Sequence, residues 1–368
     1  MNNLYQIPNL PLRLKFESLA MYKQLTLASR ALAELKGVAK TIPNESILLN
    51  TLVLQEAKDS SEVENIVTTQ DEVYQADLDM VETVTKTAQK EVLRYRQAMH
   101  TGFNLVRKNK LLTNSVIIQI QQELEENTAG FRAVPGTALK NGNNETVYTP
   151  PQTKEEIVRL MCNLEHFIND KKICELDPLI KLPIIHHQFE SIHPFYDGNG
   201  RTGRIINILY LVANDLLDLP ILYLSRYINH NKADYYRLIQ CVRDNAPDNE
   251  KDWENWIVFM LNGIEVTAKE TVLLIQKIKN LMQDYKQIIR PLFGSKYNHE
   301  LLNNLFRHPY TKIEYIMRDL EVTRQTASKY LDELVENNLV KKLHIGNSNY
   351  YINQQLVDLF LNQADMYK

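Results

Sequence analysis

The sequence contains little glycine and little proline. Of its 368 residues, 11 are glycine and 13 are proline. Glycine supplies the positive-φ positions of tight turns, and proline interrupts helices. Long stretches without either residue therefore favour helices. We predict a mainly α-helical protein, with amphipathic helical spacing at 13–36, 46–67 and 71–126. In the last of these ranges, Val81 and Val84 are among the expected core residues.

The chain also has few cysteines and no long apolar run. Cys162, Cys174 and Cys241 are odd in number, widely spaced and outside any metal-binding pattern. They predict buried, reduced thiols and a cytoplasmic location. No segment reaches the roughly 18 apolar residues of a membrane span. The first 12 residues lack the pattern of a secretory signal. We expect no association with a membrane.

The chain also has no large excess of positive or negative charge. The formal net charge is −3, and 24% of the residues are charged while 44% are apolar. These values are typical of a globular protein, and the length suggests two or three domains. A chain without a basic excess gives no overall field that would attract nucleic acid.

Glycine is nevertheless concentrated at one place. Gly198, Gly200 and Gly203 lie within six positions. The apolar run 205–212 follows directly and predicts a buried helix. The glycines would then lie at the N-terminus of that helix. Unpaired N–H groups and the positive end of the helix dipole bind phosphate there.

Charged residues around this turn complete a set suited to phosphate chemistry. Arg201 and Arg204 are three residues apart, so they share a helix face and can each bind phosphate oxygens. Asp197 is placed to hold Mg2+, and His193 can accept a proton near neutral pH. Together these side chains predict transfer of a phosphate-bearing group to a hydroxyl.

The same stretch resembles the core motif of a known family. Residues 193–204 read His-Pro-Phe-Tyr-Asp-Gly-Asn-Gly-Arg-Thr-Gly-Arg. The order His-Pro-Phe-x-Asp-Gly-Asn-Gly-Arg-x-x-Arg is that of Fic-domain proteins, and the resemblance covers about residues 50–270. It implies a helical bundle that binds ATP and transfers AMP to a protein hydroxyl. A glycine-rich structural turn between two helices is the alternative interpretation.

The resemblance also implies roles for individual residues. His193 would be the catalytic base, Asp197 would hold Mg2+, and Tyr236 would line the adenosine pocket. The alternative for Tyr236 is core packing. The remaining expected nucleotide contacts are Gly198, Asn199, Gly200, Arg201, Thr202, Gly203 and Arg204.

An inhibitory segment is implied near residues 60–65. Ser60, Glu64 and Asn65 match the family pattern Ser/Thr-x-x-x-Glu-Gly/Asn. The resemblance makes Ser60 and Glu64 inhibitory, with Glu64 pairing to Arg204 in place of the γ-phosphate. Judged by residue type alone, Ser60 or Ser61 would cap the start of a helix, and Glu64 would be a solvated charge.

A β-hairpin is predicted before the core motif. Turn-forming residues cluster between 130 and 151, and between them lies the β-prone run Thr146, Val147, Tyr148 and Thr149. The resemblance implies a flap that docks the target chain by strand pairing. An ordinary surface connection is the alternative.

The C-terminal part changes character. A long helix is predicted over Ile264–Ile289, stopped by Pro291. Two short helices follow, then a third capped by Thr323, then alternating residues 339–352 with a turn at 346–349. This order resembles a winged helix. Residues 307–352 contain seven basic and six acidic residues, so a basic DNA-binding footprint is lacking. DNA and protein both remain open as partners.

We therefore predict a Fic helical bundle with a hairpin flap and a C-terminal winged-helix-like domain. The expected division is 1–110, 111–270, 271–293 and 294–368. The expected function is autoinhibited AMP transfer from ATP, with Mg2+, to a Ser, Thr or Tyr hydroxyl of a target protein or of the chain itself. The alternatives are a DNA-binding regulator with a nucleotide-sensing Fic module, another donor, or removal of AMP. The target and the oligomeric state, a homo-oligomer included, stay open.

Overall fold

The chain forms two compact units, each built mainly of helices. The computed structural model describes residues 5–79, 87–245, 249–345 and 348–361. The first unit comprises Met1–Lys36, Asp59–Ile66 and Arg94–Lys269. The second comprises Gly37–Lys58, Val67–Leu93 and Glu270–Lys368. The predicted mainly α fold is confirmed, whereas the predicted four-part division stays a prediction. Val81 and Val84 lie outside the described residues.

Several helices cross the borders of these units. They are α1 (Leu19–Ala39), α2 (Glu45–Val63), α4 (Thr87–Asn109) and α11 (Glu250–Phe293). The elements wholly inside the first unit are α5 (Asn114–Glu125), β1 (Leu139–Lys140), β2 (Thr146–Tyr148), α6 (Lys154–Asn169), α7 (Pro178–Ile192), α8 (Asn199–Ala213), α9 (Leu224–His230) and α10 (Lys232–Asp244). Strands β1 and β2 pair antiparallel, which confirms the predicted hairpin.

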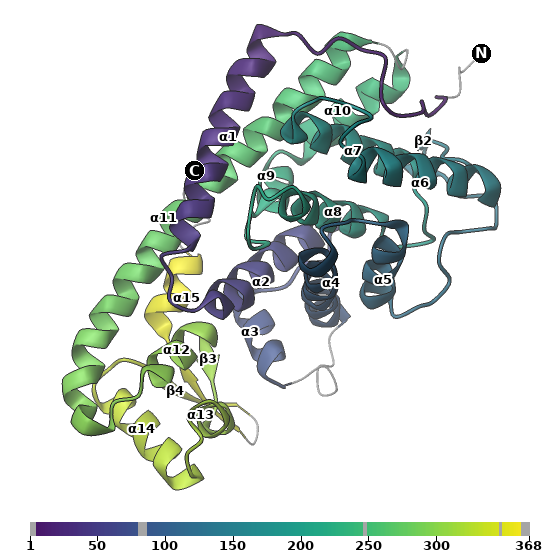
Figure 1. Cartoon of the computed structure of the whole chain (residues 1–368). Helices are drawn as coiled ribbons and strands as arrows, with labels where there is room; N and C mark the ends of the chain where they lie inside the picture. Colours follow the sequence, from purple (N-terminus) through teal and green to yellow (C-terminus); the bar gives the residue numbers. More distant parts are fainter. Residues whose placement is uncertain (1–4, 80–86, 246–248, 346–347, 362–368) are drawn as a thin grey trace. The chain divides into compact units, whose positions relative to one another are not determined.

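Helices α7 and α8 form the centre of the first unit and pack against each other (Figure 1). Pro178 begins α7, and Asp177 caps it by accepting a hydrogen bond from the Leu179 N–H at 2.8 Å. Every side chain from Leu179 to Ile192 is buried. The first turn of α8 is buried too, Gly200 aside, and its following apolar run is fully buried, as the sequence predicts. The core motif is thus the connection between two buried helices.

The second unit contains the predicted order of three helices and a hairpin. The elements are α12 (His299–Arg307), β3 (Tyr310–Thr311), α13 (Ile313–Leu320), α14 (Arg324–Glu336), β4 (Lys341–Ile345), β5 (Ser348–Ile352) and α15 (Gln354–Leu361), with the 3-10 turn Gly294–Lys296 before them. The antiparallel sheet has the order β3-β5-β4. Thr323 caps α14, as predicted, by accepting a hydrogen bond from the Thr326 N–H. The residues Gly346 and Asn347 of the expected turn lie outside the described residues.

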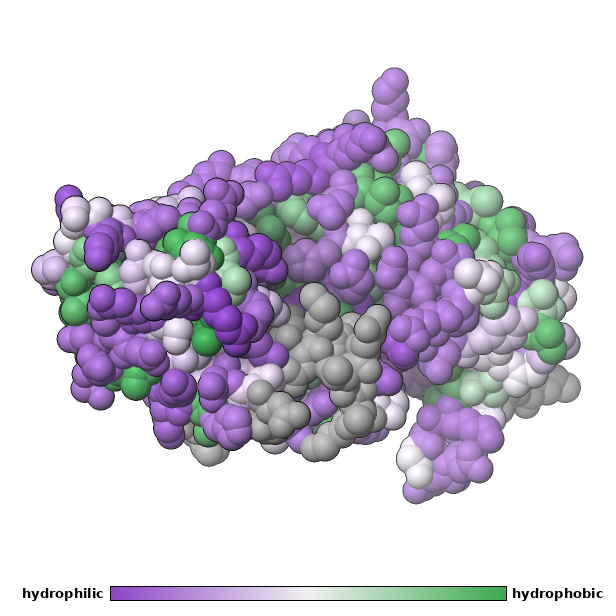
Figure 2. Space-filling view, turned by 90° about the horizontal axis from the view of Figure 1, so that it is seen from below, coloured by the Kyte–Doolittle hydropathy of each residue, from purple (hydrophilic) through white to green (hydrophobic). Residues whose placement is uncertain are grey.

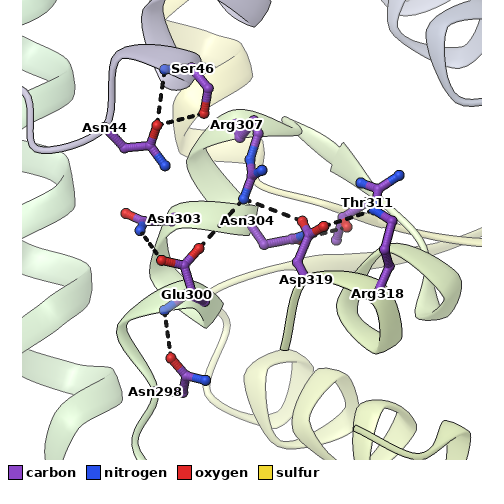
Figure 3. A network of polar contacts seen from close by, with 10 residues as sticks. All are labelled: Asn44, Ser46, Asn298, Glu300, Asn303, Asn304, Arg307, Thr311, Arg318 and Asp319. Atoms are coloured by element: carbon purple, nitrogen blue, oxygen red, sulfur yellow. Dashed lines mark hydrogen bonds and ion pairs between the residues drawn. The ribbon is translucent and has the colours of Figure 1, made fainter. Parts of the chain in front are cut away.

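A polar network joins α12, β3 and α13 (Figure 3). The carboxylate of Asp319 accepts a hydrogen bond from Asn304 at 2.7 Å and forms ion pairs with Arg307 and Arg318. The Thr311 hydroxyl donates to the side-chain oxygen of Asn304 at 2.7 Å. Since buried polar groups need partners, this network fixes how the three elements meet.

Helix α3 (Gln70–Asp79) packs on this same unit. The rings of Tyr74 and Tyr310 are stacked with centroids 5.6 Å apart. The Tyr310 hydroxyl donates a hydrogen bond to Asp71 at 2.9 Å. The segment that follows the inhibitory motif in sequence is therefore anchored on β3.

Three local predictions are wrong. Pro291 lies inside α11 and does not stop it, because a proline so close to a helix end removes only one hydrogen bond. Ser60 and Ser61 lie in the last turns of α2 and cap no helix start; Asn44 instead accepts the Ser46 N–H. The cysteines are free thiols, but none of them is buried: Cys162 is exposed on α6, and Cys174 and Cys241 are half-buried.

The surface carries scattered apolar side chains. Figure 2 shows small hydrophobic patches on one face, separated by hydrophilic residues. Exposed Leu19, Val67 and Val134 are examples of apolar surface residues. Among the described residues, no helix combines the length and hydropathy needed to cross a bilayer.

Candidate active site

A cavity of about 660 Å³ lies over the junction of α7 and α8. It contains His193 and Arg204 of the core motif, Glu64 of the inhibitory motif, and Tyr236. The other lining residues are Asn65, Leu139, Lys140, Asn141, Gly142, Val147, Glu190, Gly200, Lys232, Tyr235, Arg237, Ile239, Gln240 and Arg243. All belong to the first unit. Segments far apart in the sequence thus meet around one hollow.

The backbone around His193 is held in place by Arg132. His193 ends α7 with φ 49°. The buried Arg132 donates from Nε to the His193 carbonyl at 2.8 Å, and its own N–H donates to the Pro194 carbonyl at 2.9 Å. Loop carbonyls that leave a helix need such donors. Arg132, which the sequence did not single out, therefore fixes the backbone at His193.

His193 is electrically suited to accept a proton. Burial, together with the nearby Arg243 and Arg132, lowers the pKa of its imidazole to about 4. The side chain is neutral at pH 7, which is the form that a general base requires.

The glycine-rich turn is closed by Asn199. Its side-chain oxygen accepts the Phe195 N–H and its amide donates to the Phe195 carbonyl, both at 2.9 Å. Gly198 has φ 76°, a conformation that favours glycine. The Asn199 side chain therefore shapes the loop, while the first turn of α8 contributes the main-chain N–H groups that a helix start leaves unpaired.

The other motif residues lie beside the cavity. Thr202 and Gly203 are buried, and a Cβ added to Gly203 would meet Glu190 and Phe189, so Gly203 allows α7 and α8 to approach. Asp197 is exposed, and its carboxylate accepts the Gly198 N–H at 2.7 Å. None of these three residues lines the cavity.

Arg204 is bound by the segment for which an inhibitory role was predicted. Its side chain is 2% exposed, and Nη2 lies 2.8 Å from the Glu64 carboxylate. Nε donates to the Ser60 hydroxyl at 2.8 Å, and Nη2 donates to the Ser60 carbonyl at 3.0 Å. The two residues singled out in the sequence at 60 and 64 thus both contact the second arginine of the core motif.

The Glu64 carboxylate also covers the start of α8. A Cβ added to Gly200 would collide with Glu64 Oε1. Burial alone would raise the pKa of Glu64, but Arg204 outweighs burial and the pKa is lowered. An ionised carboxylate therefore lies where the helix N-terminus and an arginine converge. These are the groups that would otherwise attract a phosphate.

Asn65 explains the Gly/Asn choice in the inhibitory pattern. It has φ 63° and lies two residues after the end of α2 at Val63. Glycine and asparagine adopt this left-handed conformation most readily. Lys232 at the start of α10 donates to the Asn65 side chain at 2.8 Å. The chain therefore turns sharply once it has delivered Glu64 to Arg204.

A second arginine–carboxylate pair was not predicted. Arg201 Nη2 lies 2.7 Å from Glu125 Oε1, and the two side chains are 6% and 15% exposed. Glu125 is the last residue of α5. It stands 76 positions before Arg201 in a helix without any recognisable motif, so no sequence signal indicated the contact.

Glu190, which lines the cavity, belongs to a buried polar layer. Burial raises the pKa of Glu190 to about 7. His186 contacts the Tyr235 hydroxyl at 2.8 Å and Asn207 at 3.0 Å, and burial lowers the pKa of His186 to about 3. Among the described residues, no group of three His, Cys, Asp or Glu side chains is arranged to hold a metal ion.

The hairpin is tied to the helices that line the cavity. Gln240 of α10 donates to the Val147 carbonyl at 3.1 Å, and the Tyr148 hydroxyl donates to the Ser191 carbonyl at 2.9 Å. Thr146 and Val147 are exposed, whereas Thr149 is half-buried. Tyr236 is 46% exposed and lies in the cavity lining, so it is not a core residue.

Three family models match the chain in succession. They are the Fic/DOC family N-terminal model over residues 22–104, the Fic/DOC family model over 111–211, and the model of the protein adenylyltransferase SoFic-like C-terminal domain over 281–356. The chain is a Fic-domain protein. The predicted resemblance is thereby confirmed, and the C-terminal match lies in a segment whose family the sequence motifs did not indicate.

Curated relatives are similar over short stretches. A probable protein adenylyltransferase of Aquifex aeolicus is 40% identical over 80 residues, 22% of this chain and 23% of that protein. A protein adenylyltransferase of Drosophila grimshawi is 36% identical over 118 residues, 32% of this chain and 22% of that protein. The similarity thus spans less than a quarter of each relative.

Solved structures show the same fold over longer stretches. A Fic family protein from Desulfovibrio desulfuricans has a TM-score of 0.58 at 17% identity, covering 95% of this chain and 98% of that chain. A Fic protein from C. elegans has a TM-score of 0.51 at 16% identity, covering 70% of this chain and 73% of that chain. At these sequence identities, both structures show that the fold is shared and nothing further.

Proposed function

We propose that this Fic-domain protein is a protein adenylyltransferase that is held inactive by Glu64. The observation that carries the proposal is the cavity in which a neutral His193, the N-terminal turn of α8 and Arg204 converge. Similarity to protein adenylyltransferases of Aquifex aeolicus and Drosophila grimshawi supports the same reaction. The substrates are ATP and a Ser, Thr or Tyr hydroxyl of a target protein, the chain itself included.

The reaction joins the hydroxyl oxygen to the α-phosphorus of ATP. His193 takes the hydroxyl proton as the new oxygen–phosphorus bond forms, and the bond to the bridging oxygen breaks to release pyrophosphate. Main-chain N–H groups of Asn199 and Gly200 and the guanidinium groups of Arg201 and Arg204 stabilise the charge on the phosphates, whereas the Gly198 N–H is used by the Asp197 carboxylate. We assign the contribution of Asn199 to its main-chain N–H, because its side chain closes the loop.

The residues beside the loop fit Mg2+ bound together with ATP. Mg2+ is usually held by one or two carboxylates, several waters and the substrate phosphates. Asp197 offers an exposed carboxylate of which one oxygen accepts the Gly198 N–H. When bound, the cation would neutralise phosphate charge, and Asp197 would hold it at the edge of the glycine-rich turn.

The remaining assignments follow from position. Tyr236 and Ile239 form a wall of the cavity that suits the adenosine, and Thr202 and Gly203 support the first turn of α8. The hairpin residues 146–149 would dock the target chain, since Thr146 and Val147 are exposed and Val147 lines the cavity.

Glu64 makes the free protein inactive in this proposal. The carboxylate occupies the place on Arg204 that the γ-phosphate needs, so bound ATP would have displaced phosphates. Attack in line on the α-phosphorus would then fail, because a misplacement of about 1 Å can cost on the order of 10²-fold in rate.

A donor panel tests this function. The Glu64→Gly variant is incubated with Mg2+ and with ATP, GTP, UTP or CTP labelled in the α-phosphate, and label on protein is measured. Label from ATP alone, lost in Glu64→Gly/His193→Ala, is the expected result. Label from another nucleotide would change the donor, and no label from any of them would reject the transferase.

A further inference from the structure

The two arginines of the core motif are both paired with carboxylates, but the two pairs differ in kind. Glu64 lies beyond the end of α2, its side chain is 36% exposed, and both Glu64 and Arg204 line the cavity. Glu125 belongs to α5 and is 15% exposed, and neither Glu125 nor Arg201 lines the cavity. The first pair can be opened by a ligand in the cavity, whereas the second lies beside it.

Glu125 also packs against the anion-binding turn itself. A Cβ added to Gly198 would collide with Glu125 Oε1. One turn earlier in α5, Gln121 Nε2 donates to the Asp197 carbonyl at 3.4 Å. The C-terminal end of α5 therefore contacts the turn at Asp197 and at Gly198, and it contacts Arg201, the third residue of α8. Displacing Glu125 would disturb the backbone that the phosphates need.

From this geometry we propose that Glu125 is a positioning residue for AMP transfer, which acts by holding Arg201. The proposal rests on the proposed function. A long arginine side chain has much rotational freedom, and a fixed carboxylate partner removes part of it before substrate binds. A guanidinium has five N–H donors in a planar fork, so it can serve a carboxylate and a phosphate together.

The two carboxylates then have opposite effects. Glu64 competes with ATP for Arg204, and its removal activates. Glu125 orients Arg201 for the charge that develops on the phosphates, and its removal slows transfer. A charge placed in advance stabilises a transition state more than a mobile one does, because no reorganisation is needed during the reaction.

The test uses Glu125→Gln in the Glu64→Gly parent. Glutamine keeps the size of the side chain and removes its charge. We expect the transfer rate at saturating ATP to fall about 10- to 100-fold, the effect of a misplacement of about 1 Å. ATP affinity, measured by calorimetry, should change little, because two effects offset each other. Removing a negative charge near the phosphates favours binding, and the greater mobility of Arg201 disfavours it. A loss of general stability would instead lower both quantities together with the melting temperature.

Two controls separate this role from others. Glu126→Gln changes the adjacent residue, whose exposed side chain pairs with Arg94 at the surface, and it should leave transfer unchanged. In an Arg201→Lys background, Glu125→Gln should cause little further loss, because residues that act as one unit are not additive.

Three results would overturn the inference. The first is full transfer by Glu125→Gln in the Glu64→Gly parent. The second is increased transfer by Glu125→Gln in the chain that keeps Glu64. The third is an equally large effect of Glu125→Gln in the Arg201→Lys background. A parent that transfers nothing from any nucleotide rejects the proposed function and this inference with it. An active parent with an equally active Glu125→Gln variant rejects only the positioning role.

Discussion

Replacement of Glu64 by glycine should raise AMP transfer well above that of the unmodified chain. The change removes the carboxylate 2.8 Å from Arg204 and opens the space over Gly200. Arg204 keeps its contacts with Ser60, so its side chain stays near its present position. The arginine and the start of α8 then become available to the phosphates of ATP.

The magnitude follows from the lost contact. A hydrogen bond to a charged group contributes about 1.5–3 kcal/mol. Glu64 is 36% exposed, so solvent screening reduces this to about 1–2 kcal/mol. That free energy corresponds to a factor of about 5–30 in favour of correctly bound ATP. Restoring the in-line geometry adds to the rate, and we expect a total gain between about 10- and 100-fold.

The assay compares initial rates of α-phosphate label transfer among matched variants. Glu64→Gln, which keeps size but removes charge, should give an intermediate gain. Glu62→Gly places glycine inside the last turn of α2 and controls for a weakened helix. Equal rates in Glu64→Gly and the unmodified chain, or an equal gain in Glu62→Gly, would refute the idea that the Glu64 charge is inhibitory.

Three further outcomes are expected. Because the pKa of His193 is lowered to about 4, kcat/KM of Glu64→Gly should not fall between pH 7 and pH 6; a fall centred near 6.5 would mean an unperturbed base. Asn65 has φ 63°, which valine disfavours and glycine accepts, so Asn65→Val should destabilise the turn after Glu64 and raise basal transfer, whereas Asn65→Gly should not. Equal basal transfer by the two variants would show that this turn does not contribute to inhibition. The pKa of Glu190 is raised from 4.5 to about 7, so the native state binds the proton more tightly and the free energy of unfolding decreases from pH 4.5 to 7. Glu190→Gln should remove up to about 3 kcal/mol of that decrease, measured by unfolding at several pH values. An unchanged pH dependence would argue against a buried, protonated Glu190.

The parts of the site that lie close together in sequence could be predicted. The glycines, Arg201 and Arg204 are set by a short turn and one helical repeat, so their spacing alone indicated an anion-binding helix start. The Thr323 cap and the hairpins followed from equally local rules. Such features depend on neighbouring residues and little else.

Contacts between distant segments could not be derived in this way. Glu64 and Arg204 are 140 positions apart, and only the family resemblance suggested that they meet. Glu125 had no such support and was missed, as was Arg132, whose role depends on loop carbonyls more than 60 positions away. Pro291 was misjudged because its cost depends on where the helix ends, which tertiary packing decides.

The central claim is that the transferred group is AMP, and the position of the label in ATP tests it most directly. Glu64→Gly is incubated in parallel with ATP labelled in the α-phosphate and with ATP labelled in the γ-phosphate. Protein-bound label is expected from the α-labelled ATP only, with an equal amount of pyrophosphate released and no transfer by Glu64→Gly/His193→Ala. Label retained from the γ-phosphate, or nucleotide binding without any protein-bound label, would contradict it.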